Sequence, residues 1–282
     1  MGSRVTKDEY EASETKFMEI EDAGDDLEKM LNCLEEGRVF LQPMFRQEDP
    51  STHILKVKQF WKMPYGPNLL SKYFEWLVDG STDGDLSVSI QDHLDCVLRM
   101  TVKILGDKKG ESWLRKLEEV ENNCEAKNGN DILKQVFIIR ELAKSWKNDP
   151  EKIIFIQGED DNQKASDQPY INIVKVDKFG EGDHEETVVI SVKVGRTTIF
   201  EDVSLCVGLA SVIQLSFVFH LLYPISADDI FNYVQRILGK FGPSEGAKNM
   251  KGQVKKRFID FQCAIADIVL LEKKGTVQKL YV

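Results

Sequence analysis

The most apolar stretch of this 282-residue chain spans residues 203–223. It reads VSLCVGLASVIQLSFVFHLLY, contains no Asp, Glu, Lys or Arg, and is followed directly by Pro224. At 3.6 residues per turn it is long enough for about five turns of α-helix. A helix that is apolar on nearly all sides needs either a lipid bilayer or the interior of a folded protein around it.

The residues in and around this stretch favour the protein interior. Five of its side chains are polar, and its flanks are acidic, with Glu201 and Asp202 before it and Asp228 and Asp229 after it. A membrane span usually has a cluster of Lys or Arg near one end, and neither end here carries one. We therefore predict a buried core helix and no integral membrane span. The polar residues within the stretch are Ser204, Ser211, Gln214, Ser216 and His220.

Composition and charge narrow the function classes. Hydrophobic residues make up 42% of the chain and charged residues 30%, which is typical of an ordinary folded protein. The net charge of −10 weighs against nucleic-acid binding, which depends on Lys and Arg neutralising phosphates. Residues 1–36 hold twelve Asp or Glu against four Lys or Arg, whereas residues 240–282 hold nine Lys or Arg against four Asp or Glu. The acidic residues 1–36 and the basic residues 240–282 are either solvated separately or attract each other across a dimer.

The cysteines indicate a reducing compartment. There are five, an odd number, and they lie far apart without a CxxC pair. This is not the pattern of a disulfide framework in a secreted protein. The first thirty residues contain no apolar run of the kind found in a signal peptide. We expect a cytoplasmic protein, with the nucleus as the alternative compartment.

Residues 1–23 are polar and acidic and show no periodicity, so we predict a disordered acidic tail. The chain begins MGSRVT, which fits the pattern for N-myristoylation and makes Gly2 a candidate lipidation site. The same start, MGS, is common in recombinant proteins, so the pattern has two explanations. A single myristoyl chain binds membranes only marginally, and the acidic residues that follow would repel anionic lipids.

Residues 24–148 are predicted to form a helical domain, a bundle or array of amphipathic helices. Apolar residues recur there at helical spacing, Asp residues stand at helix starts, and Gly37 occupies a position typical of a helix C-terminus. All four tryptophans lie in this part, and at this spacing they are typical packing residues. The predicted helices cover roughly residues 25–36, 53–63, 69–79, 89–105, 113–120 and 131–146.

Residues 149–282 are predicted to form an α+β domain. Short β-branched runs follow Pro150, and Gly195 with Arg196 separates two of them in the manner of a type II′ hairpin. Helices are expected at 203–223, 228–238 and 258–271. The predicted fold class is therefore α+β, with an N-terminal helical bundle followed by a small antiparallel sheet packed on a buried hydrophobic helix. Residues 153–158 form a short apolar run, and the predicted strands lie near residues 170–176, 187–194 and 197–200.

One region resembles a known set of proteins. A hairpin is followed by a long apolar helix, by Leu221-Leu222-Tyr223-Pro224, and then by a helix that ends with Gln235-Arg236-Ile237-Leu238. With these residues, the segment 187–240 resembles the C-terminal region of uncharacterised animal proteins that are abundant in fish, some of them labelled sterile-alpha-motif-containing-like. We find no sterile alpha motif in the first half of the chain. The resemblance implies a fold for this segment but no activity, cofactor or site residue.

No group of residues predicts catalysis. Cys206 and His220 lie on one predicted helix about 21 Å apart along its axis, too far for a hydrogen-bonded pair. His93 and Cys96 share a helix face, but two ligands do not make a zinc site. Motifs for phosphate loops, dinucleotide binding, zinc proteases and serine hydrolases are all missing from the sequence. We therefore predict no catalytic, cofactor-binding or metal-binding residues and a protein that is not an enzyme.

The basic segment near the C-terminus is the remaining candidate for a binding site. Its basic residues are either a solvated linker or a contact for phosphate groups. Our first prediction is an intracellular protein-interaction or scaffold protein that binds another protein or a second copy of itself. The alternative is a nucleic-acid-associated protein derived from a mobile element and using this segment. An enzyme assembled from distant segments is a third option. The candidate contact residues are Lys248, Lys251, Lys255, Lys256 and Arg257.

Overall fold

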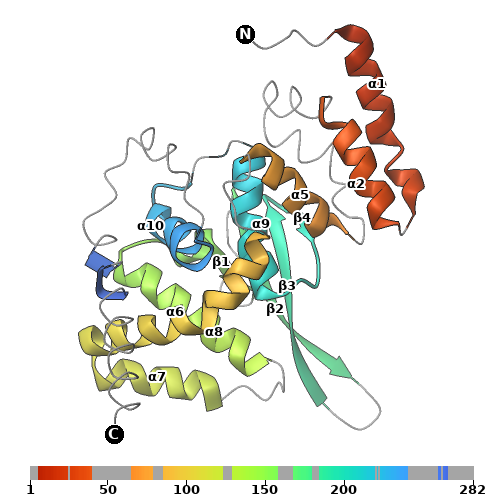
Figure 1. Cartoon of the computed structure of the whole chain (residues 1–282). Coiled ribbons are helices and arrows are strands. Elements are labelled where there is room, and N and C mark those ends of the chain that lie inside the picture. The colour runs from red at the N-terminus through yellow and green to blue at the C-terminus, as the bar shows by residue number, and fades with distance from the viewer. Residues whose placement is uncertain are drawn as a thin grey trace, which may run out of the picture.

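The structure is a computed structural model, and it has an α+β fold in which helices precede a four-stranded sheet (Figure 1). This confirms the predicted class. The structure describes residues 6–24, 26–39, 65–78, 85–122, 129–157, 168–179, 184–219, 221, 223–240, 260–261 and 263–265.

The first helix, α1 (Lys7–Met18), corrects the expectation that residues 1–23 are disordered. Thr6 and Glu9 form a capping box, in which Glu9 N donates to Thr6 Oγ1 at 3.3 Å and Thr6 N donates to Glu9 Oε2 at 2.8 Å. The 3₁₀ turn η1 (Glu21–Ala23) follows. Local capping and the packing of a few residues produce this helix without a regular apolar stripe, which is why periodicity did not reveal it. Gly2 lies outside the described residues.

Helix α2 (Leu27–Glu36) runs as predicted, and Asp26 caps it by accepting a hydrogen bond from Lys29 N at 3.0 Å. Gly37 ends the helix, but its φ of −77° is not left-handed. A glycine is needed here because α1 lies so close. A Cβ built on Gly37 would be 2.8 Å from the Cβ of Phe17. The pair α1 and α2 thus forms a tightly packed helical hairpin (Figure 1).

The other helices of the N-terminal part are α5 (Gly66–Leu77), α6 (Leu86–Lys109), α7 (Glu111–Asn122) and α8 (Gly129–Ser145). Each corresponds to a predicted helix, whereas the helix predicted at 53–63 lies outside the described residues. Helix α6 begins earlier than expected because Asp85 caps it, accepting a hydrogen bond from Ser87 N at 2.7 Å. At its other end Gly110, with φ of 75°, separates α6 from α7.

The sheet has the order β1-β2-β3-β4 and is formed by β1 (Ile154–Ile156), β2 (Pro169–Phe179), β3 (His184–Val194) and β4 (Thr197–Phe200). Strands β2, β3 and β4 are antiparallel, as predicted, and Gly195, with φ of 60°, lies in the two-residue turn between β3 and β4. Strand β1 pairs parallel with β2, so the sheet is mixed and not purely antiparallel. The twelve residues between β1 and β2 are about the length that a parallel connection needs.

Helix α9 (Leu205–Val218) is the predicted core helix, and its position confirms that prediction. Ser204 caps it, accepting a hydrogen bond from Val207 N at 3.2 Å, so the helix is shorter than the apolar stretch itself. It packs on β2 and β3 on one side and on α5 and α6 on the other (Figure 1). Gly208 faces the sheet, where a Cβ would meet Ile171 Cδ1 at 3.4 Å, an ordinary van der Waals contact. Within the described ranges, no helix has the length and apolarity to span a membrane.

The last well-described elements are α10 (Asp228–Tyr233) and the π-helical turn η3 (Val234–Leu238), which pack against α6 and α8. Phe261 joins them, with its ring centroid 5.1 Å from that of Trp146. The buried residues of the helical part and of the α+β part form a single core. The domain boundary expected between residues 148 and 149 remains a prediction. The residues on its two sides contribute to the same hydrophobic core.

Candidate functional site

A surface pocket with a cavity volume of about 400 Å³ opens where the end of α6 meets α7 and α8. We call it the α6–α8 pocket. Three of its lining side chains are lysines and one is a glutamate, although the whole chain has a net charge of −10. The pocket is therefore a local basic site on an acidic protein. Its lining residues are Lys109, Ser112, Trp113, Lys116, Phe137, Glu141 and Lys144.

Local sequence explains how these helices meet. Gly110 ends α6 in a left-handed conformation, and α7 begins at the next residue, so the two helices are joined without a loop. Helix α7 buries Trp113 and Leu117 and packs against α8. The rings of Trp113 and Phe137 stack with centroids 6.2 Å apart and an angle of 22° between their planes. This aromatic pair lines the pocket with apolar surface.

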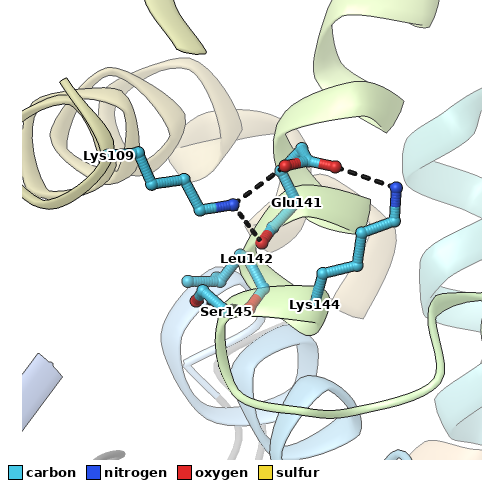
Figure 2. A network of polar contacts seen from close by, with 5 residues as sticks. All are labelled: Lys109, Glu141, Leu142, Lys144 and Ser145. Atoms are coloured by element: carbon cyan, nitrogen blue, oxygen red, sulfur yellow. Dashed lines mark hydrogen bonds and ion pairs between the residues drawn. The ribbon is translucent and has the colours of Figure 1, made fainter. Parts of the chain in front are cut away.

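Two lysines that line the pocket, Lys109 and Lys144, hold the carboxylate of Glu141 (Figure 2). Lys109 Nζ donates to Glu141 Oε2 at 2.8 Å and to the Glu141 backbone oxygen at 3.3 Å. Lys144 Nζ donates to Glu141 Oε1 at 2.9 Å. Lys109 Nζ also lies 5.9 Å from the centroid of the Trp113 ring, within the range of a cation–π contact. The network links α6 to α8 through charge-assisted hydrogen bonds.

The electrostatics of the pocket favour an additional anion. Burial opposes the ionisation of Glu141, but the hydrogen bonds and charges of Lys109 and Lys144 hold the pKa of its carboxyl below the ordinary value. Its side chain is only 15% exposed, whereas that of Lys144 is 53% exposed. Lys116 is exposed and forms no ion pair within the described ranges. The pocket thus has three ammonium groups and one carboxylate, and the side chains of Lys116 and Lys144 are exposed.

The chemistry of the lining residues suits binding. Ser112 carries the only hydroxyl group among them, and none of the hydrogen bonds found among the described residues joins it to Glu141 or to a lysine of the pocket that could act as its base. Nucleophilic catalysis needs such a base within hydrogen-bond reach. Ammonium groups next to aromatic rings instead favour a ligand that combines negative charge with apolar surface.

The singled-out residues that the structure describes do not line the α6–α8 pocket. Gly2, His220 and the basic segment fall outside the described residues. His93 and Cys96 lie on α6, where His93 Nδ1 is 2.6 Å from the backbone oxygen of Ser89. In the part of the chain that the structure describes, no three His, Cys, Asp or Glu side chains are grouped to hold a metal ion. The undescribed basic segment consists of Lys248, Lys251, Lys255, Lys256 and Arg257.

Sequence reasoning did not find the α6–α8 pocket. The sequence identified Trp113 only as a packing residue, and its pattern did not single out the three lysines. The one available signal was the spacing of Lys109, Trp113 and Lys116, which places two cations around an aromatic residue at helical intervals. That signal is weak because Gly110 interrupts the helix between them.

Comparison with known proteins gave no match to a protein-family model, to a curated protein or to a solved structure. The resemblance proposed for residues 187–240 remains a prediction.

Proposed function

We propose that this chain is a non-enzymatic protein-interaction protein and that its α6–α8 pocket binds an acidic segment of a protein partner. The observation that carries the proposal is the set of three lysines, Lys109, Lys116 and Lys144, that line the pocket beside its single carboxylate, Glu141, which two of them bind. In a chain with a net charge of −10, such a cluster attracts acidic surfaces to one place.

The way in which Glu141 is bound supports a carboxylate as the ligand. Lys109 and Lys144 reach its two carboxylate oxygens at 2.8 and 2.9 Å, so the pocket already accommodates one such group. Each ammonium carries three donors, and Lys144 can therefore bind Glu141 and a partner's carboxylate together. Lys116 offers a second position for an Asp or Glu of the partner. Phe137, which is partly exposed, adds an apolar contact beside these charges.

A protein partner fits this pocket better than a nucleic acid does. Nucleic-acid sites track a charged backbone with an extended basic stripe, and binding grows with the number of phosphates neutralised. Here the cations converge on one cavity, and the net charge of the chain would repel a long polyanion. A cavity of about 400 Å³ accommodates one or two side chains of a helix or peptide.

Fluorescence anisotropy with the full chain and a labelled helical peptide carrying Glu along one face tests the proposal. We expect binding that weakens several-fold when salt rises from about 50 to about 200 mM, because the Debye length shortens. The variant K116E/K144E should bind about tenfold or more weakly. The variant K103E is the matched control, because Lys103 is exposed on α6 but does not line the pocket.

Two results would overturn the proposal. One is a loss of specificity: the wild-type chain and K116E/K144E bind the peptide equally well, or the wild-type chain binds a peptide with Gln in place of Glu as well as it binds the Glu peptide. The other is a single-stranded oligonucleotide that binds more tightly than the peptide and is released when the basic C-terminal segment is reversed in charge. The second result would favour the nucleic-acid alternative. The segment reversed in that experiment comprises Lys248, Lys251, Lys255, Lys256 and Arg257.

A further inference from the structure

The acidic hairpin of α1 and α2 lies at the end of the molecule opposite to α7 and the α6–α8 pocket (Figure 1). Residues 1–36, which include both helices, hold twelve Asp or Glu against four Lys or Arg. We propose that the acidic segment bound by the α6–α8 pocket is helix α1 of a second copy of this chain. This inference rests on the proposed function and names the partner.

Helix α1 presents most of its surface to solvent. It is attached to α2 through Phe17, which is buried, and through Ser13, whose Oγ donates to the backbone oxygen of Glu36 at 2.8 Å. On a neighbouring face, Glu11, Glu14 and Met18 follow one another at i, i+3 and i+7. The Met18 side chain is 58% exposed, which is unusual for an apolar residue in this structure.

The exposed face of α1 and the α6–α8 pocket have complementary chemistry. The face offers two carboxylates and, one to two turns further on, a thioether. The pocket offers the exposed ammonium groups of Lys116 and Lys144 next to the partly exposed ring of Phe137. Carboxylates pair with the lysines, and a methionine sulfur makes a favourable contact with an aromatic ring.

The placement of the two surfaces requires two molecules. The hairpin and the pocket lie at opposite ends of the same chain, so α1 does not reach its own pocket (Figure 1). A contact between two different surfaces of identical chains is heterologous, and it closes only when the geometry brings the free ends together. Because the pairs are exposed, the association is reversible and sensitive to salt.

Sedimentation velocity of the full chain over a range of concentrations tests this inference. At low salt the weight-average mass should rise with concentration above 32.2 kDa, and it should return to that of a single chain at about 0.5 M salt. The variants E11K/E14K and K116E/K144E should each associate about tenfold or more weakly. The variant R196E changes an exposed charge in the β3–β4 turn and should associate like the wild type.

Mixing the two charge-reversed variants is the decisive measurement. Each repels its own kind, but the basic α1 of E11K/E14K matches the acidic pocket of K116E/K144E, and the reverse pairing is that of the wild type. We expect an equimolar mixture to regain association, which no general damage to folding would produce.

Three results would overturn the inference. In the first, the chain stays a monomer at every concentration but still binds the acidic peptide. In the second, the mixture of the two variants does not regain association. In the third, association is abolished by reversing the charges of residues 248–257 but not by reversing those of the pocket lysines. The first of these leaves the proposed function intact, because the pocket would still bind an acidic partner. Failure of peptide binding would instead remove the proposed function itself.

Discussion

The hydroxyl groups of Thr101 and Tyr233 lie 3.1 Å apart in the buried core and join α6 to α10. Thr101 Oγ1 also donates to the backbone oxygen of Val97 at 2.8 Å, which uses its only proton. The phenol of Tyr233 is therefore the donor in the pair. Burial raises the pKa of Tyr233, and the phenol keeps the proton that this hydrogen bond needs.

Removing the hydroxyl of Thr101 should destabilise the fold more than removing that of Tyr233. Thr101→Val leaves a buried phenol without its acceptor and should lower the free energy of unfolding by about 1–3 kcal/mol. Tyr233→Phe removes the donor and should lower it by about 1 kcal/mol. The double variant should lose less than the sum, because no unpaired phenol remains. Urea denaturation measures all three values, and strict additivity would contradict the hydrogen bond.

Two glycine substitutions should have opposite effects. Gly37→Ala places a Cβ 2.8 Å from Phe17 Cβ and 3.0 Å from the Cys33 backbone oxygen, and should destabilise the α1–α2 hairpin by about 1–3 kcal/mol. Gly106→Ala lies within α6, where the nearest atom is Leu114 Cδ2 at 3.4 Å, and should stabilise the fold by about 0.5–1 kcal/mol. Thermal unfolding compares them. A neutral Gly37→Ala would mean that α1 and α2 pack more loosely than described.

The elements that the sequence predicted are those whose pattern lies within a single short stretch of the chain. Apolar spacing and caps such as Asp26 revealed α2 and α5–α8, and Gly195 revealed the β3–β4 turn. Helix α1 was missed because its signal is a capping box, Thr6 with Glu9, that no apolar run follows. The parallel pairing of β1 with β2 was missed because strand direction depends on the connection and not on the residues of the strand.

Acid should weaken the network at Glu141. The pKa of Glu141 is lower in the folded chain than its ordinary value of 4.5. Its ion pairs therefore add stability that is complete above that value and is lost as the pH falls through the lower, folded pKa. Relative to Glu141→Gln, the wild type should be more stable by about 1 kcal/mol near pH 7, and the difference should shrink below pH 4.5.

Urea unfolding of both proteins across acidic and neutral pH measures this difference. Lys7→Gln, which removes an exposed pair with Glu11, is the control and should change stability little at any pH. A gap between wild type and Glu141→Gln that is constant down to about pH 3 would contradict the assignment of this linkage to Glu141.

Replacing the buried amide of Gln214 should stabilise the core. The side chain lies in α9 and is 2% exposed, and its Nε2 has no acceptor among the described residues. Gln214→Met keeps the length of the side chain without the buried donor and should raise the free energy of unfolding by about 1 kcal/mol. Ser216→Ala is the matched control. Its hydroxyl is satisfied by the Val212 backbone oxygen at 2.8 Å, so removing it should lower stability slightly. The reverse order of the two variants would contradict the prediction.

The α6–α8 pocket illustrates why a site is harder to predict than a helix. Lys109 and Glu141 lie 32 positions apart, so no spacing rule for a single helix connects them. They meet because α6 and α8 pack together and because Gly110 directs α7 across both. The packing of three helices determines which lysines converge, and this packing depends on the whole core.

Helix α9 comes late in the chain, and it separates the elements on which it packs. The apolar sides of α5 and α6, and later those of β2 and β3, leave the ribosome before residue 205 does. Until then the apolar sides of these elements lack the helix that covers them in the folded chain. Helix α9 must therefore leave the ribosome before the sheet and the helices α5 and α6 can close over a common core.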